Sequence, residues 1–255
     1  MPAVIFITGA SSGLGAELAR HYAAEGAVLG LAGRRTAALE DLVAGLRGKC
    51  HIYPLDVTDA PALSAAASDF IKRAGVPDLV IANAGISVGT LTEEIEDLPA
   101  FARVMEANVL GMVYTFQPFI AAMKRIRRGQ LVGIGSVAGI RGMPGAGAYC
   151  ASKAAAIVYL ESLRVELSAS GIVVTTIVPG YIATPMTAVN RYPMPFLLPA
   201  ADAARRIARQ IERGVSYAVV PWQMAIAAKL LRLLPNPLFD RLFSRAGRKS
   251  RDLPL

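Results

Sequence analysis

The stretch Val4-Ile5-Phe6-Ile7-Thr8-Gly9-Ala10-Ser11-Ser12-Gly13-Leu14-Gly15 decides the fold of this chain. Its first four residues form a short apolar run that is typical of a buried parallel strand. Leu14, Leu18 and Tyr22 then recur at helical spacing. A strand, a glycine-rich turn and a helix in this order predict a dinucleotide-binding turn, because glycines let the backbone approach a pyrophosphate and a helix N-terminus offers free N–H groups. The spacing is Gly-x-x-x-Gly-x-Gly, and a glycine-rich turn alone is weak evidence because glycine serves any tight turn.

Beyond this stretch, apolar runs alternate with amphipathic helical patterns along the 255 residues. We expect strands near 4–8, 27–32, 51–55, 78–82, 130–135, 172–178 and 216–220, and helices near 13–25, 36–47, 60–73, 97–126, 148–169 and 200–213. The alternation predicts one Rossmann-like α/β domain, with a doubly wound sheet of about seven parallel strands flanked by helices. We assign residues 1–221 to this domain and residues 222–255 to a basic, amphipathic C-terminal extension of it.

Tyr149 and Lys153 lie four residues apart, and Ser136 lies thirteen residues before Tyr149. Positions i and i+4 share a face of a helix, so the phenol and the ammonium would be neighbours. The lysine charge would favour the phenolate and bring a pKa near ~10 closer to neutrality, as a general acid/base requires. The pair alone is also compatible with a packed tyrosine and a solvated lysine.

The chain resembles the short-chain dehydrogenase/reductase family over most of its length. The resemblance is carried, in order along the chain, by the turn at 8–15, Asp56-Val57, Asn83-Ala84-Gly85, Asn108, Ser136, Tyr149-x-x-x-Lys153 and Pro179-Gly180 through Thr184. Ala82 stands where the family often has a second asparagine, which is a mild departure. The resemblance implies an oxidoreductase that interconverts a carbonyl and a secondary alcohol by hydride transfer with a nicotinamide cofactor.

The resemblance also implies roles for single residues. Tyr149 would be the general acid/base, and Lys153 would lower its pKa and hold the nicotinamide ribose. Ser136 would orient the carbonyl, and Asn108 would anchor a water that relays protons to Lys153. Two alternatives stay open: Asn108 as a mid-helix residue that bonds locally, and Asp56 as a turn or cap residue. The implied cofactor-binding residues are Thr8, Gly9, Ser11, Ser12, Gly13, Leu14, Gly15, Asp56, Val57, Asn83, Ala84, Gly85, Tyr149, Lys153, Pro179, Gly180, Ile182 and Thr184.

The second predicted strand runs into Gly33-Arg34-Arg35, which bears on the choice of cofactor. Proteins that use NAD usually place an acidic side chain near this point for the ribose 2′-hydroxyl, and none is here. Arginine instead suits a 2′-phosphate, through planar multi-donor contacts and full charge. We therefore predict NADP(H) in preference to NAD(H), with Arg34 as the main phosphate contact and Arg35 as its helper. The alternative is that both are solvated residues at a helix start.

By position in the family, residues 184–200 would form the substrate loop. The loop is strongly apolar, with Met186, Tyr192, Met194, Phe196, Leu197 and Leu198. Apolar pockets suit apolar ligands, so we expect a hydrophobic carbonyl or alcohol substrate, lipid-like or steroid-like. A lid that packs on its own protein is the alternative.

The C-terminal extension holds most of the charge. From Gln223 to Leu255 there are seven cations against two acidic residues, a net +5 out of +8 for the chain. The helix expected near 222–234 is too short and too charged to span a bilayer. It could lie in a membrane interface, cover the substrate mouth or form a dimer contact. Packing or oligomer contact is favoured, because apolar helical faces usually pack against protein. The resemblance implies a homodimer or homotetramer, and peripheral membrane contact through 222–245 stays open.

Several classes are disfavoured. The first strand begins within a few residues and no charged leader precedes it, so we expect a cytoplasmic protein, with a peripheral position at a membrane surface left open. Cys50 and Cys150 are too few for a disulfide framework. No cluster of histidine, cysteine and carboxylate has metal-ligand spacing, and neither His21 nor His51 is a catalytic candidate.

Two rival functions remain. The basic tail prompts nucleic-acid binding, but it lacks an aromatic-interleaved basic groove, so we expect no nucleic-acid partner. A non-catalytic NADP(H)-binding redox sensor or scaffold of the same fold is the alternative to an enzyme, because fold alone does not decide function. The presence of all four of Asn108, Ser136, Tyr149 and Lys153 argues against it.

Overall fold

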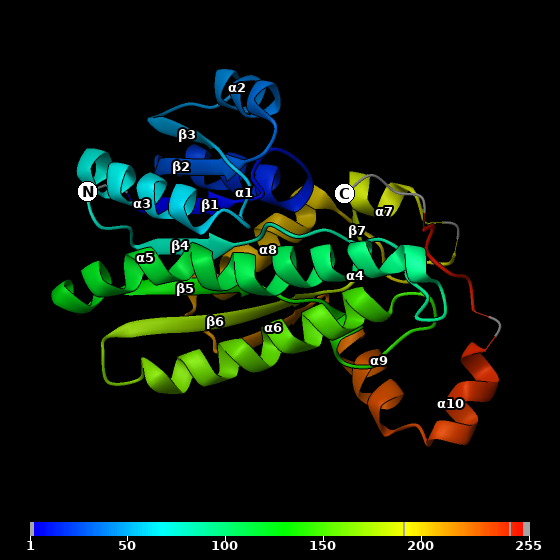
Figure 1. The fold of residues 1–255 in the computed structure, drawn as a ribbon. Coiled ribbons are helices and arrows are strands. Elements are labelled where there is room, and N and C mark those ends of the chain that lie inside the picture. The colour runs from blue at the N-terminus through cyan, green and yellow to red at the C-terminus, as the bar shows by residue number, and fades with distance from the viewer. Residues whose placement is uncertain (1–2, 191, 245, 252–255) are drawn as a thin grey trace.

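A seven-stranded parallel sheet with helices on both faces forms the body of the molecule (Figure 1). The structure is a computed structural model that describes residues 3–190, 192–244 and 246–251; the ends of the predicted domain and extension, and position 191 of the predicted substrate loop, lie outside the described residues. The sheet order is β3-β2-β1-β4-β5-β6-β9. Its strands are β1 (Val4–Thr8), β2 (Val28–Gly33), β3 (Cys50–Pro54), β4 (Leu79–Ala82), β5 (Gly129–Ile134), β6 (Ile172–Pro179) and β9 (Tyr217–Val220). The predicted doubly wound α/β fold is confirmed.

Alternating side chains of the strands divide the core into two halves. Ile5 and Ile7 of β1 face one side, and Phe6 faces the other. The first half is covered by α1 (Gly13–Ala24), α2 (Thr36–Ala44) and α8 (Ala200–Glu212). The second half is covered by α3 (Ala60–Ala74), α5 (Gly111–Ile126) and α6 (Gly147–Glu166), with α4 (Leu98–Met105) packed against α6. Both faces of the sheet are therefore buried, which explains the continuous apolar runs in its strands.

The helix predicted over 97–126 is interrupted. A π-helical turn, Glu106–Leu110, lies between α4 and α5. Such turns are rare and often occur at functional sites, and no pattern of apolar residues predicts them. This turn carries Asn108.

The predicted substrate loop contains two short strands and one helical turn. β7 (Ile182–Ala183) pairs with β8 (Leu198–Pro199), and α7 (Pro185–Ala188) follows β7. The pairing closes the loop at its base, beside the carboxyl end of β6.

After β9 the chain forms a helical hairpin, α9 (Trp222–Leu233) and α10 (Asn236–Phe243), which extends beyond the sheet (Figure 1, orange to red). α9 buries Met224 and Ala228, whereas Trp222 is 65% exposed and Leu233 is 79% exposed. The Arg141 guanidinium donates to the carbonyls of Leu231 and Leu234 and stacks 3.9 Å above the ring of Phe239. Arg141 therefore ties both helices of the hairpin to the loop after β5. Among the described helices, none combines the length and the apolar character that a bilayer crossing needs.

Candidate active site

The glycine-rich turn after β1 is tied to the end of β4. The Thr8 hydroxyl accepts hydrogen bonds from the backbone N–H groups of Asn83 and Ala84, both at 3.3 Å. The Asn83 side-chain amide donates to the carbonyls of Thr8 and Gly9, at 3.1 and 3.3 Å. Neighbouring strands β1 and β4 mark the point where the strand order reverses, which is where such sheets bind ligands.

This turn has the features that a dinucleotide phosphate needs. An added Cβ at Gly15 would collide with the carbonyl oxygen of Gly9, so only glycine permits the close approach of α1 to the turn. Ser12 precedes α1, and in the described structure its side chain makes no capping hydrogen bond, which leaves the N–H groups of the first helical turn for an anion. A surface cavity of about 260 Å³ opens beside the turn, lined by Ser11, Ser12, Gly13, Ala16, Arg20, Ala38, Asp41 and Leu42. These residues fit a phosphate-bearing cofactor.

The side chains of the two arginines after β2 contact different residues. Arg35 donates to the carbonyl and the hydroxyl of Ser11 in the glycine-rich turn, both at 3.3 Å. Arg34 lies 3.9 Å from the Asp56 carboxylate. Arg35 therefore touches the glycine-rich turn, and the expectation that Arg34 is the main contact of a 2′-phosphate, with Arg35 as its helper, stays a prediction.

Asp56 is held by its own surroundings. It accepts from the backbone N–H and the hydroxyl of Thr58, at 3.0 and 2.9 Å, and it pairs with Arg103 at 2.9 Å. Burial would raise the pKa of Asp56, but these hydrogen bonds and the charges of Arg103 and Arg34 outweigh it and lower the pKa. The turn interpretation of Asp56 agrees with these contacts, and its role toward the adenine stays a prediction. Arg103 has no signal in the sequence, because it lies 47 residues away along the chain.

Ser136, Tyr149 and Lys153 come together at the carboxyl end of β5. Ser136 begins the 3-10 turn Val137–Gly139, and its hydroxyl accepts from the Ala138 N–H at 3.2 Å. Tyr149 and Lys153 lie in the first two turns of α6, with the lysine Nζ 5.9 Å from the centre of the tyrosine ring. Lys153 is only 4% exposed, and its ammonium donates to the Ile134 carbonyl at 2.9 Å. The predicted helical pairing of phenol and ammonium agrees with this geometry.

The pKa values of the two groups respond mainly to burial. Burial raises the pKa of Tyr149, and a hydrogen bond with Ser136 opposes the rise. Burial lowers the pKa of Lys153 to about 8. We expected Lys153 to lower the tyrosine pKa. In this structure removal of the phenol from water is the larger effect, and the ammonium is directed to the Ile134 carbonyl.

Asn108 connects the loop after β4 to α6. Its side-chain oxygen accepts from the Ile86 N–H at 2.8 Å, and its side-chain nitrogen donates to the Ile86 carbonyl at 3.0 Å and to the Ser152 hydroxyl at 2.9 Å. An added Cβ at Gly85 would lie 2.9 Å from the Asn108 oxygen and 3.5 Å from the Lys153 Nζ, so these two side chains border the same small space. Asn108 is therefore more than a residue that bonds locally. Ser152, which sequence reasoning missed, lies within the Tyr149-to-Lys153 segment and is fully buried.

The segment after β6 reaches back to the glycine-rich turn. An added Cβ at Gly13 would lie 3.2 Å from the Thr184 side chain. Thr184 caps α7, in a reciprocal arrangement with Thr187. Ile182 is buried in β7, and the Gly180 N–H donates to the Val220 carbonyl at 2.8 Å. Thr184 is thus brought to the phosphate turn, whereas Pro179 and Gly180 are engaged with the β6–β9 edge.

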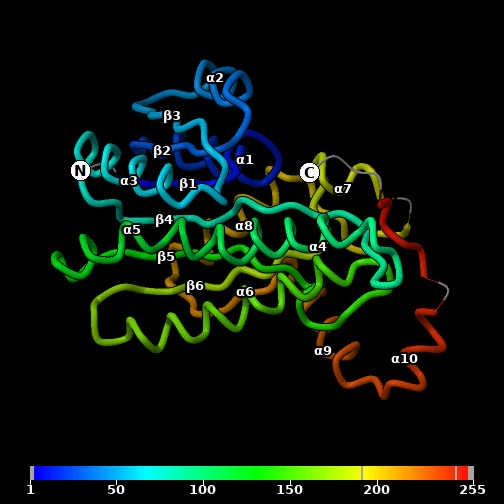
Figure 2. Tube along the Cα trace, in the orientation of Figure 1, coloured from blue at the N-terminus to red at the C-terminus, as the bar shows by residue number. Residues whose placement is uncertain are grey.

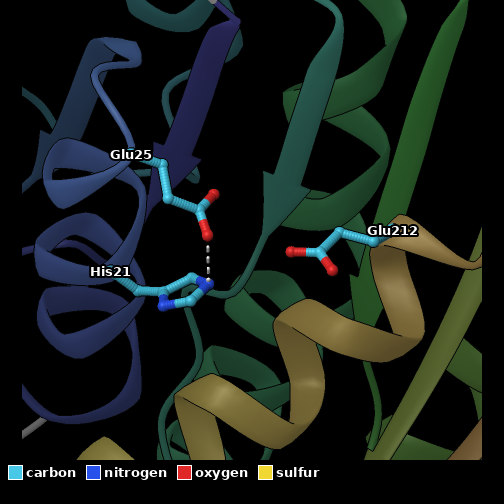
Figure 3. A group of neighbouring side chains, drawn as sticks. All are labelled: His21, Glu25 and Glu212. Carbon is cyan, nitrogen blue, oxygen red and sulfur yellow. Dashed lines mark ion pairs between the residues drawn. The ribbon is translucent and has the colours of Figure 1, made fainter.

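Three further ligand-type side chains meet at the other end of the sheet (Figure 3). His21 and Glu25 of the α1 end form an ion pair at 3.3 Å, and the Glu212 carboxylate at the end of α8 points toward them. Their ligand atoms lie within 4.8 Å of one another. Sequence spacing found no such group, because Glu212 is remote along the chain. Both carboxylates are exposed, and the ion pair accounts for the contact between His21 and Glu25. The two cysteines are free thiols.

Comparison with known proteins agrees with this architecture. The family model described as short chain dehydrogenase matches residues 3–194. A protein described as an uncharacterized oxidoreductase from Myxococcus xanthus is 40% identical, over 92% of this chain and 93% of the relative. The dehydrogenase/reductase SDR family member 7B of Bos taurus is 35% identical, over 98% of this chain and 82% of the relative.

Solved structures show the same likeness. A short-chain dehydrogenase from Streptomyces avermitilis superposes with a TM-score of 0.81 at 26% identity, covering 90% of this chain and 91% of its own. Levodione reductase superposes with a TM-score of 0.78 at 25% identity, covering 88% of this chain and 98% of its own. The chain therefore belongs to the short-chain dehydrogenase/reductase family and is an oxidoreductase of that type.

Proposed function

We propose that the protein interconverts a carbonyl and a secondary alcohol with NADP(H), with Tyr149 as the general acid/base. The observation that carries the proposal is the meeting of Ser136, Tyr149, Lys153 and Asn108 at the carboxyl edge of the sheet, beside a glycine-rich turn with an uncapped helix. A rival role as a nucleotide sensor needs the turn but gives no reason for the four side chains.

The chemistry divides between cofactor and protein. The nicotinamide, when bound, donates or accepts the hydride. Tyr149 gives a proton to the carbonyl oxygen during reduction and removes it during oxidation, and Ser136 orients that oxygen. Lys153 has three ammonium donors, of which the described structure assigns one to the Ile134 carbonyl, so the others can hold ribose hydroxyls. Asn108 keeps the Ile86 backbone in place at the rim of the site. The family resemblance further implies that Asn108 anchors a water that relays protons to Lys153.

NADP(H) is the proposed cofactor because no acidic residue occupies 33–35 and two arginines do. Arg35 donates to Ser11 of the phosphate turn, and Arg34 stands by Asp56 at the adenine side, so a 2′-phosphate between them would meet two cations. A charged hydrogen bond contributes on the order of 1.5–3 kcal/mol, which corresponds to roughly 10–100-fold in affinity. The measurement is kcat/KM with NADPH and with NADH; a preference for NADH would contradict this choice.

An apolar substrate is supported by the loop that closes the site. Met186, Phe196 and Leu197 are each more than a third exposed, on a loop whose base lies beside the carboxyl end of β6. One similar structure is named levodione reductase, which for that protein denotes a ketone substrate. NADPH oxidation against ketones graded by size and polarity is the direct test of the reaction; no turnover on any of them would contradict the enzyme proposal.

We also propose that copies of the chain associate through α5 and α6, as a dimer or tetramer. Val158 and Val165, seven residues apart and so on one face of α6, are both 63% exposed and offer an apolar surface to a second copy. Size-exclusion chromatography with light scattering, before and after Val158→Lys, tests this surface. A monomer in both forms would contradict the assignment.

The α9–α10 hairpin has an exposed apolar stripe, Trp222, Ile226, Leu230 and Leu233, next to the cations Lys229 and Arg232. This combination supports a hairpin that contacts an anionic membrane surface at its periphery. Flotation with anionic vesicles should recover the wild-type chain and lose Trp222→Ser/Leu230→Ser. Equal recovery of both, or recovery of neither, would contradict the membrane contact.

A further inference from the structure

The chain returns to the active-site edge after α10. Residues 246–251, here called the strap, run from the hairpin toward α7 (Figure 2, red). The Gly89 N–H donates to the Ser250 carbonyl at 2.8 Å, and the Lys249 ammonium donates to the Ser87 hydroxyl at 3.0 Å. Arg251 pairs with Asp97 at 2.8 Å and with Glu94 at 3.5 Å. These contacts attach the strap to the segment between β4 and α4.

The strap crosses three loops that follow three neighbouring strands. After β4, an added Cβ at Gly89 would collide with the Lys249 carbonyl. After β5, an added Cβ at Gly145 would lie 3.0 Å from the Arg248 side chain. After β6, the Lys249 ammonium reaches the Met186 carbonyl at 3.3 Å. Ligands of doubly wound sheets bind between such loops, so the strap spans the mouth of the substrate side of the crevice.

The strap also lies close to the catalytic centre. An added Cβ at Gly247 would lie 2.9 Å from the Tyr192 Cβ. Burial raises the pKa of Tyr192 to about 12, and electrostatic interactions with Tyr181 and Tyr149 add to the rise. Tyr149 therefore lies near enough to Tyr192 to influence its charge. Ser87, the partner of Lys249, follows Ile86, whose backbone Asn108 holds. Lys249 therefore binds the residue next to Ile86, which Asn108 holds at the rim of the proposed catalytic site.

We propose that the strap forms the outer wall of the substrate site and that Lys249 binds a carboxylate or phosphate group of an otherwise apolar carbonyl substrate. The inference rests on the proposed reaction and names the substrate class. The two acceptors that the described structure gives the Lys249 ammonium, Ser87 and Met186, are both neutral. Arg251, two residues further on, lies on two carboxylates and so serves as the anchor of the strap.

The pKa of Lys249 supports its assignment to a substrate anion. Burial lowers the pKa of Lys249 to about 8, so the ammonium is charged at pH 7 in a place that disfavours charge. An anion of the substrate would pair with it, whereas neutral acceptors leave its charge uncompensated. The apolar loop with Met186, Phe196 and Leu197 would receive the rest of the substrate.

The test uses three ketones that differ at one position and yield secondary alcohols: 4-acetylbenzoate, 4-acetylphenyl phosphate and methyl 4-acetylbenzoate. Steady-state kinetics with NADPH should show that the wild-type chain prefers at least one anion over the ester by roughly tenfold or more in kcat/KM, as a charged hydrogen bond implies. Lys249→Met should remove this preference by raising KM for the anions, and kcat/KM for the ester should fall much less than kcat/KM for the preferred anion. The two anions distinguish a carboxylate substrate from a phosphate.

Two variants serve as controls. Lys229→Met makes the same chemical change on exposed α9, outside the strap, and should keep the preference. Lys249→Arg retains the charge and should keep it within a few-fold. Preference for the ester, turnover of neither anion, or an equal loss on all three ketones in Lys249→Met would overturn the inference. Reduction of the ester by the wild-type chain tests the proposed reaction separately, because the ester does not need Lys249.

Discussion

At the amino edge of the sheet, the Asp78 carboxylate accepts from the Val4 N–H at 2.9 Å and from Arg128 at 2.5 Å. At the carboxyl edge, the buried Lys153 ammonium donates to a neutral carbonyl, that of Ile134. A paired charge contributes to stability, whereas a buried cation beside neutral acceptors reduces it. We therefore propose that these two charges differ in role: Asp78 holds strands together, and Lys153 is kept for a ligand. The largest expected effect of a substitution is on turnover, and the next two effects are on the free energy of unfolding.

Tyr149→Phe should lower kcat/KM for carbonyl reduction by roughly a thousandfold or more, because phenylalanine has no proton to donate and Tyr149 is the proposed general acid. NADPH affinity, measured by fluorescence titration, should change by less than about threefold. Tyr159→Phe, on the same helix α6 and partly buried, is the matched control and should keep its activity. Activity above a tenth of wild type in Tyr149→Phe would contradict the assigned role.

Lys153→Met should make the cofactor-free protein more stable below pH 8. The folded pKa of Lys153 is about 8 against an ordinary 10.5, so the unfolded chain binds more protons between these values and the unfolding free energy rises with pH there. Below about pH 8 the buried charge costs on the order of 3 kcal/mol, which the substitution removes.

Urea unfolding at pH 7 and at pH 10 measures this effect. The advantage of Lys153→Met should shrink at the higher pH, while Lys229→Met, which removes an exposed lysine, should show no such trend. A variant that is less stable than wild type at pH 7 would show that Lys153 stabilises the fold as the amino-edge charges do.

Asp78→Ala should act in the opposite direction, by about 1–2 kcal/mol of lost unfolding free energy, because the half-buried Val4 N–H and the exposed Arg128 both lose an acceptor at the start of β1. Asp202→Ala removes an exposed ion pair with Arg205 on α8 and should cost less than about 1 kcal/mol. Turnover per folded molecule should stay at the wild-type level in both. Loss of turnover in Asp78→Ala without loss of stability would remove the distinction between the edges.

The smallest effect is expected at His21, Glu25 and Glu212, also at the amino edge. Their carboxylates are exposed and the His21–Glu25 contact is an ordinary ion pair, so we expect no resident metal. Treatment with a chelator should shift Tm by less than about 1 °C, since a ligand stabilises only when it is bound to the native state. A rise in Tm on adding Zn²⁺ that disappears in His21→Ala would contradict this expectation.

The sequence predicted the features that depend on neighbours along the chain. The seven strands followed from local apolar runs, and Tyr149 and Lys153 from helical spacing. Contacts between distant segments left no local pattern. Asp56 and Arg103 are 47 residues apart, and Ser87 and Lys249 are 162 residues apart. The π-helical turn at Asn108 was missed for another reason. A single π turn adds only one residue, which does not visibly change the spacing of apolar residues over a window of about eleven residues.

The arginines show an intermediate case. The pair Arg34-Arg35 predicted a phosphate site with Arg34 as the main contact, but the direction of each side chain cannot be read from the sequence, because neighbouring residues leave a strand in different directions. In the structure Arg35 reaches Ser11, and Arg34 lies beside Asp56.

Arg141 lies five residues after Ser136 in the sequence. Its guanidinium binds both helices of the hairpin that precedes the strap. A swing of the whole hairpin would have to break its bonds to the Leu231 and Leu234 carbonyls, to Asn236 and to the Phe239 ring at once. Release of the strap alone leaves these four Arg141 contacts intact. We therefore expect small molecules to enter by a movement of the last few described residues, while the hairpin stays docked.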